Sequence, residues 1–346
     1  LLIEQLSAQL VALEDRVVSP DSLARLRSDQ ASHRVAVKSN VAASAPRPID
    51  AVNSIRGGLR VLCRSLEQLG QLIDLGVDDI IADFSDIRDY GEAVSMVSAS
   101  SAASASVSLF IAPPRIQKAG EIGIFKAMQK HEGVGILVRN LAGLRYFHDL
   151  GTIVDADFSL NAANDLTVEL LHDWGARRVT SSYDLNRDQL VELLQRSDMP
   201  SLEVVVHQHM PMFHMEHCVF CAVLSPGTNK TNCGRPCDDH EVKLRDRVGM
   251  EHPLTADVGC RNTLFNATPQ SAAEVVPQLL KQGVRHFRVE LLWEDAAGVR
   301  RIVDLYRRLL DGKIAAADVW AALQASNRVG VTRGTLEERR NPLAIL

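Results

Sequence analysis

The chain has 346 residues and a formal net charge of −5, with 46% hydrophobic and 23% charged residues. These are ordinary values for a globular protein, and they exclude an intrinsically disordered chain, a collagen-like chain and a general polybasic nucleic-acid binder. The length suits one large domain or two domains of ordinary size.

Residues 1–58 differ in composition from the rest and predict a helical connector. Pro20 ends the first helical pattern, and residues 39–48 are rich in Ala, Ser and Pro, as linkers are. A helical hairpin packed on the main domain is the alternative. The first helix is indicated by four leucines at helical spacing, namely Leu2, Leu6, Leu10 and Leu13.

The start of the chain also bears on its location. It has no initiator Met, so we expect a piece of a longer protein with an upstream region or a partner subunit. It shows neither a secretory signal pattern nor an 18-residue apolar run, so we expect no membrane partner and a cytoplasmic or organelle-stroma location.

From Leu59 onward, short β-branched apolar runs alternate with helical stretches. Eight such units over about 250 residues favour a closed parallel (β/α)8 barrel over an open doubly wound sheet, and no glycine-rich nucleotide-binding motif supports the open sheet. We therefore predict a barrel over residues 59–312, with a Cys-rich loop at 218–260, and a helical tail over 313–346. The expected strands are 59–63, 79–84, 106–111, 133–138, 152–160, 178–182, 202–207 and 286–292.

Polar side chains lie at or just past the ends of several predicted strands, where barrel enzymes hold their active sites. Arg115 and Arg139 are the candidate anion-binding residues because a guanidinium pairs with a carboxylate or phosphate through two hydrogen bonds. Asn161 and Tyr183 are further candidates for substrate binding. The alternative is that these positions are polar only because strands end in loops.

Thiols and imidazoles gather in one stretch. Five of the six cysteines fall between residues 218 and 260: Cys218, Cys221, Cys233, Cys237 and Cys260. Thiolates at short spacings predict zinc or an iron–sulfur cluster, and only the first pair has the C-x2-C spacing of a zinc knuckle, which favours [4Fe–4S]. Strand alternation places His207 and His209 on the face of Glu203, pointing into the barrel or its mouth.

The same stretch resembles peptidase family U32, also called the collagenase-like proteases. The matching elements are LEVVVH at 202–207, CAVLS at 221–225, NCGRPC at 232–237, DVGC at 257–260 and RVELL at 288–292. Three positions depart from the family pattern: Gln208 replaces a glycine, Leu291-Leu292 replace a Gly-Arg pair, and Cys218 stands unusually near Cys221.

The resemblance implies one of two activities. The family name implies a peptidase, yet several members are oxygen-independent hydroxylases or RNA base-modification factors with a [4Fe–4S] cluster, some of which draw the hydroxyl group from prephenate. On this second interpretation four of the five thiols bind the cluster; Cys221, Cys233 and Cys260 are the firmest ligands, and Cys218 and Cys237 compete for the fourth place.

Site roles follow from the hydroxylase interpretation. His207 and His209 are expected to act as acid/base groups, Glu290 to orient the substrate or act as a second base, and Arg115 and Arg139 to bind a small carboxylate donor. A peptide or an RNA remains open as the substrate. The alternatives are a peptidase, whose metal site could use His207, His209 and Glu216, and a non-catalytic iron–sulfur partner domain.

Overall fold

The computed structural model describes residues 21–28, 57–101, 107–197 and 201–326. Residues 1–53 and 54–346 form two separate units. In the first unit residues 22–28 are helical. Most of the predicted connector, and residues 327–346 of the predicted tail, lie outside the described residues. Within the described residues, no helix combines the length and apolar character needed to cross a bilayer.

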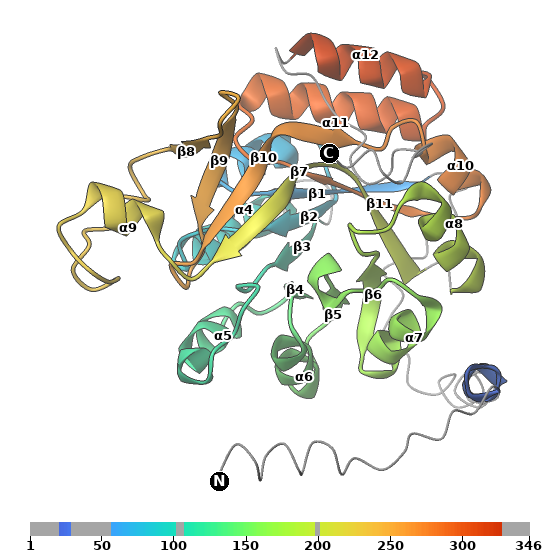
Figure 1. Cartoon of the computed structure of the whole chain (residues 1–346), viewed down its shortest axis with the longest axis horizontal. Helices are drawn as coiled ribbons and strands as arrows, with labels where there is room; N and C mark the ends of the chain where they lie inside the picture. Colours follow the sequence, from blue (N-terminus) through green and yellow to red (C-terminus); the bar gives the residue numbers. More distant parts are fainter. Residues whose placement is uncertain (1–20, 29–56, 102–106, 198–200, 327–346) are drawn as a thin grey trace, which may run out of the picture. The chain divides into compact units, whose positions relative to one another are not determined.

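Eight parallel strands close into a barrel in the second unit (Figure 1). Neighbours pair in chain order, and the last strand, β11, pairs with both β1 and β7, which closes the ring. The predicted (β/α)8 fold is confirmed, with several strands shorter than expected. The barrel strands are β1 (Gly58–Cys63), β2 (Asp79–Ala82), β3 (Ser108–Ile111), β4 (Gly135–Val138), β5 (Val154–Ala156), β6 (Ala176–Thr180), β7 (Leu202–Met215) and β11 (His286–Glu290).

Amphipathic helices cover the outside of the barrel. Most begin at a polar residue that accepts a hydrogen bond from the helix backbone, such as Ser65, Asn140, Asn186 and Asp295. Their apolar faces and the outward side chains of the strands form one large core. The helices are α3 (Leu66–Asp74), α4 (Asp89–Ser101), α5 (Ile122–Met128), α6 (Leu141–Asp149), α7 (Asp165–Asp173), α8 (Arg187–Arg196), α10 (Val276–Lys281), α11 (Ala296–Leu310) and α12 (Ala316–Ser326), with short turns at η2 (Ala119–Glu121) and η3 (Phe158–Leu160).

Strand β7 does not end at His207, as the sequence suggested, but runs eight residues further as part of an antiparallel arm. Beyond the barrel its backbone pairs with β10 (Asn262–Ser271), which pairs with β9 (Glu251–Ala256), which pairs with β8 (Val242–Arg245). Pro211, Pro253 and Pro269 lie within β7, β9 and β10. Pro211 and Pro269 lie where the register between β7 and β10 shifts, and strands tolerate proline at such irregular positions.

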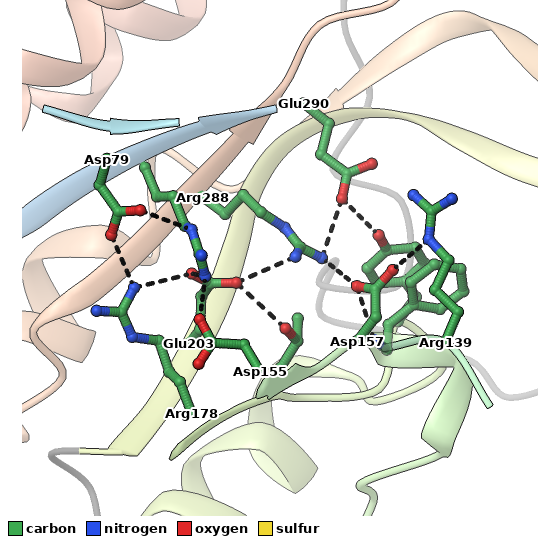
Figure 2. A network of polar contacts seen from close by, with 12 residues as sticks. Asp79, Arg139, Asp155, Asp157, Arg178, Glu203, Arg288 and Glu290 are labelled. Carbon is green, nitrogen blue, oxygen red and sulfur yellow. Dashed lines mark hydrogen bonds and ion pairs between the residues drawn. The ribbon is translucent and has the colours of Figure 1, made fainter. Parts of the chain in front are cut away.

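Charged side chains fill much of the barrel interior and reach its mouth (Figure 2). One connected network joins six arginines to six carboxylates: Arg60, Arg64, Arg139, Arg177, Arg178 and Arg288 with Asp79, Asp83, Asp155, Asp157, Glu203 and Glu290. Burial by itself would raise the pKa of Asp155, but Arg60, Arg177 and Arg178 lower it to about 2. The buried charges therefore remain ionised and depend on one another.

Substituting one buried arginine is expected to destabilise the barrel strongly. Arg60→Met preserves side-chain length but removes a cation that Asp79, Asp155 and Glu203 all share, which should lower the free energy of unfolding by about 3–5 kcal/mol. Urea-induced unfolding followed by circular dichroism measures the change. The control is Arg145→Met, which breaks an exposed pair with Asp149 and should cost about 0.5 kcal/mol. Equal losses in the two variants would contradict the role assigned to the network.

Candidate functional site

A cavity of about 320 Å³ opens at the carboxyl ends of the barrel strands. We call it the mouth cavity. The barrel contributes charged residues such as Asp83, Arg139 and Glu290, and the arm contributes His214 and Thr263 from β7 and β10. Because the arm supplies one wall, the cavity exists only when β7 continues beyond the barrel. Its volume lies at the small end of the range for ligand sites.

Arg115 presents the freest positive charge of the mouth cavity. Its guanidinium lies 5.0 Å from the ring centroid of Phe158, whose other stacking partner, Tyr183, lies 3.7 Å away at 12°. Among the described residues, no carboxylate forms an ion pair with Arg115. The predicted anion-binding residue is thus held by an aromatic ring, with its charge uncompensated by protein.

Arg139 also lines the mouth cavity, but two carboxylates already bind it. Its Nη1 and Nη2 each donate to Asp83 at 2.8 Å, and its Nε donates to Asp157 at 3.1 Å. Burial opposes ionisation of Asp83, yet Arg139 and Arg64 hold the pKa of that carboxyl below its usual value. Arg139 therefore has fewer donors left for a ligand than Arg115, and its predicted role in substrate binding remains a prediction.

Glu290 lines the same cavity and is bound by Tyr183, which is not among the residues that line it. The Tyr183 hydroxyl donates to Glu290 Oε1 at 2.8 Å, and Arg288 approaches the same oxygen at 3.0 Å (Figure 2). Arg64 lies 3.7 Å from the other oxygen. Glu290 thus lines the cavity as an anchored acceptor. Asn161, the remaining predicted substrate residue, is exposed in a left-handed turn and lines neither cavity described here.

The structure corrects the predicted orientation of His207. Val205 pairs with Arg288 and His207 with Val289, so Val206 is an extra residue that reverses the alternation. The His207 ring packs near Tyr306, with ring centroids 5.6 Å apart. Tyr306 belongs to α11, which lies on the outside of the barrel (Figure 1). Nothing in the sequence marks this bulge.

His209 does not line the mouth cavity either. Its Nδ1 donates to the Asn266 carbonyl at 2.8 Å, and its Nε2 lies 3.8 Å from Glu294. Glu216 binds Arg261 at 2.8 Å, so the metal site that a peptidase would build from His207, His209 and Glu216 is not assembled. The histidines that do line the cavity are His214, which lies beyond the predicted end of its strand at His207, and His240, which falls in the predicted Cys-rich loop.

A second, smaller cavity of about 140 Å³ brings all five clustered thiols together, and we call it the thiol cavity. Cys218 and Cys221 come from the start of α9 (Val219–Leu224), Cys233 and Cys237 from the following loop, and Cys260 from the turn between β9 and β10. None of them forms a disulfide.

Backbone and amide groups donate hydrogen bonds to two of the sulfurs. Cys218 Sγ accepts from the Cys221 amide at 3.4 Å and from Asn262 Nδ2 at 3.8 Å, and Cys233 Sγ accepts from the Arg235 amide at 3.4 Å. Such donors stabilise thiolates and tune bound metal centres. Burial, with Asp238 nearby, raises the pKa of the Cys237 thiol to about 11, so this residue must lose a proton to bind a metal.

The five thiols that line the thiol cavity are candidate ligands for a metal centre. Zinc takes four ligands around one ion, and a [4Fe–4S] cluster takes one thiolate at each of four irons. The thiol cavity supplies enough thiols for either centre.

The two cavities share a wall. Five residues line both of them, namely Ser85, Phe220, Cys237, Ala256 and Asp257. Asp257 Oδ1 accepts from the Arg261 amide at 2.8 Å, whereas its Oδ2 is buried without a hydrogen-bond partner. Burial raises the pKa of Asp257 to about 6. A ligand in the mouth cavity would therefore lie directly beside whatever the thiols bind.

An ion pair connects residues 225–241, which we call the thiol loop, to the barrel. Arg235 Nη2 lies 2.8 Å from Asp86, which follows β2, and Arg235 Nε lies 2.9 Å from Asp238 within the loop. Two of the three non-glycine residues with positive φ in the described chain, Arg235 and Cys260, belong to this region. Contacts from outside the loop thus hold a backbone that is locally strained.

Breaking this ion pair should release the loop. Arg235→Gln is expected to raise the rate of limited proteolysis within residues 225–241 severalfold, measured by mass spectrometry of the fragments. The control is Arg88→Gln, because exposed Arg88 binds the same Asp86 but does not connect it to the loop. Equal cleavage of wild type and Arg235→Gln would show that the pair does not anchor the loop.

The fold and the site together define a class: an α/β barrel whose mouth cavity adjoins a cavity lined with thiols. Residues 82–333 match the model of peptidase family U32, and the chain belongs to that family. No curated protein matches the chain significantly.

Two solved structures are similar to the chain. A candidate fructose-1,6-biphosphate aldolase from Coccidioides immitis has a TM-score of 0.39 at 11% identity, over 77% of this chain and 87% of its own. 3-Hexulose-6-phosphate synthase has a TM-score of 0.34 at 14% identity, over 70% of this chain and 96% of its own.

Proposed function

We propose that this U32 protein is an iron–sulfur enzyme that transfers a hydroxyl group, without molecular oxygen, from a small prephenate-like carboxylate donor to an acceptor such as an RNA base. The observation that carries the proposal is the wall that the thiol cavity and the mouth cavity share, with Cys237 and Asp257 facing both. A purely structural cluster, as in a non-catalytic partner domain, has no need of an adjoining ligand cavity.

The thiols would hold the cluster. Four of Cys218, Cys221, Cys233, Cys237 and Cys260 would be its ligands, and the amide donors to Cys218 and Cys233 would stabilise those two as thiolates. When bound, a [4Fe–4S] cluster supplies one-electron transfer. Cys237 alone among the five lines the mouth cavity as well, so its thiol would be the one nearest to the donor, whether or not it is one of the four ligands.

The mouth cavity would bind the donor through its own residues. Arg115 offers an unpaired guanidinium to a carboxylate, and Phe158, held by Tyr183, keeps that guanidinium in place. Aromatic residues Phe265 and Trp293 add apolar surface to the lining. The volume of about 320 Å³ suits a small molecule, so a macromolecular acceptor would insert a single base or side chain.

Metal and sulfide analysis tests the cluster. Protein purified without oxygen is expected to be brown and to hold about four irons and four sulfides per chain. Cys221→Ala and Cys260→Ala should lose the iron, whereas Cys63→Ala should keep it because Cys63 is buried in β1, outside the thiol cavity. Colourless protein with one zinc would refute the proposal. Digestion of casein that survives removal of the iron would favour a peptidase instead.

Binding of the donor tests Arg115. Replacing Arg115 with Gln removes the charge that pairs with the carboxylate and should weaken prephenate binding at least about tenfold in anaerobic calorimetry. Arg145→Gln, which removes an exposed charge on α6, serves as the control and should bind as the wild type does. Unchanged affinity in Arg115→Gln would place the carboxylate elsewhere.

A further inference from the structure

His214 differs from the other residues discussed at the mouth cavity because one of its ring nitrogens is buried without a hydrogen-bond partner. Its Nδ1 lies 2.9 Å from Thr263 Oγ1, and the two residues are direct partners across β7 and β10. Its Nε2 is buried and has no hydrogen-bond partner. Thr263 in turn pairs with Thr255 of β9, so the arm carries a row of polar side chains along this wall of the cavity.

We propose that His214 is a specificity-determining residue whose Nε2 hydrogen-bonds a carbonyl or hydroxyl oxygen of the small carboxylate that Arg115 binds. This inference rests on the proposed function for the carboxylate and adds the second oxygen. Arg115 follows β3 of the barrel and His214 belongs to the arm, so the ligand is bound from two separate walls. The ligand class is therefore an oxygenated carboxylate rather than a simple one.

The surroundings of His214 explain why it would bind a neutral oxygen. Burial first, and then Arg115, Arg139 and Arg261, lower the pKa of His214 to about 4, against a smaller opposing effect of Glu216. The imidazole is thus neutral near pH 7 and offers either one N–H or one lone pair at Nε2. The N–H matches a carbonyl when the Thr263 hydroxyl donates to Nδ1, and the lone pair matches a hydroxyl in the other tautomer.

A neutral imidazole also separates this role from acid/base catalysis. As the pH falls toward 4, His214 would gain a positive charge beside three arginines, which is unfavourable, and above that range its charge does not change. Its contribution is therefore the orientation of an oxygen. The carboxylate remains the task of Arg115, whose charge no protein carboxylate compensates within the described residues.

The test compares carboxylates that differ by one oxygen, and it measures their binding to the wild type and to a variant that lacks the two imidazole nitrogens of His214. Phenylpyruvate and phenyllactate carry the second oxygen and 3-phenylpropionate lacks it; all three suit a cavity lined by Phe158, Phe265 and Trp293. In calorimetry on the anaerobic full chain, the wild type is expected to prefer the two oxygenated acids about fivefold or more. His214→Phe should reduce that preference to below about twofold while leaving the affinity for 3-phenylpropionate nearly unchanged.

A second variant guards against a folding defect. His214→Gln keeps an amide that can reach the position of Nε2 and should retain part of the preference. Thermal unfolding shows whether either variant is folded. If His214→Phe weakens all three acids equally, or if the wild type shows no preference, His214 does not contact the second oxygen and the inference is wrong.

Prephenate serves as a fourth ligand that separates this inference from the proposed function. If the preference depends on His214 but prephenate does not bind, the assigned role of His214 stands and the proposed donor is wrong. If prephenate binds equally well to the wild type and to His214→Phe, the donor is supported and the role of His214 is refuted.

Discussion

The mutual compensation of buried charges inside the barrel is the constraint on which the rest of the structure depends. Arg288 sits at its centre and contacts Asp157, Glu203 and Glu290, which lie directly after β5, on β7 and on its own strand β11. Removing one such charge leaves a net charge uncompensated in a buried region, which costs far more than losing an exposed pair. The same network fixes the orientations of Arg139 and Glu290. The ion pairs that stabilise the barrel therefore also form the floor of the mouth cavity.

Above that floor the site is built by the arm. Strand β7 leaves the barrel without interruption, and its backbone groups find partners in β10, because an unpaired extension would leave buried polar groups unsatisfied. This excursion brings His214 over the mouth and carries the thiol loop to a position where Arg235 can reach Asp86. The thiol cavity and the mouth cavity are therefore adjacent because the same segment of the chain supplies residues to both.

The sequence predicted well what depends on periodicity and poorly what depends on register. The β/α alternation identified all eight barrel strands, and the clustering of five cysteines between residues 218 and 260 identified the thiols that line one cavity. Arg115, Arg139, Tyr183 and Glu290 reach one end of the barrel because parallel strands end together. His207 was misplaced because a single extra residue, Val206, reverses the side-chain faces, and His214 was missed because the predicted strand ended at His207 whereas β7 continues to Met215. Neither feature changes the local hydrophobic pattern.

The arm has a consequence for how such a protein can diversify. Residues 208–271 leave the barrel partway along β7 and return before α10, and within them lie His214, Thr255, Thr263 and all five clustered thiols. The barrel contributes the network of buried ion pairs and Arg115. A single contiguous segment between two neighbouring strands contributes the thiols and one wall of the mouth cavity. Changes confined to this segment could alter which molecules are accepted while the closure of the barrel stays intact, so chemistry and scaffold can evolve at different rates.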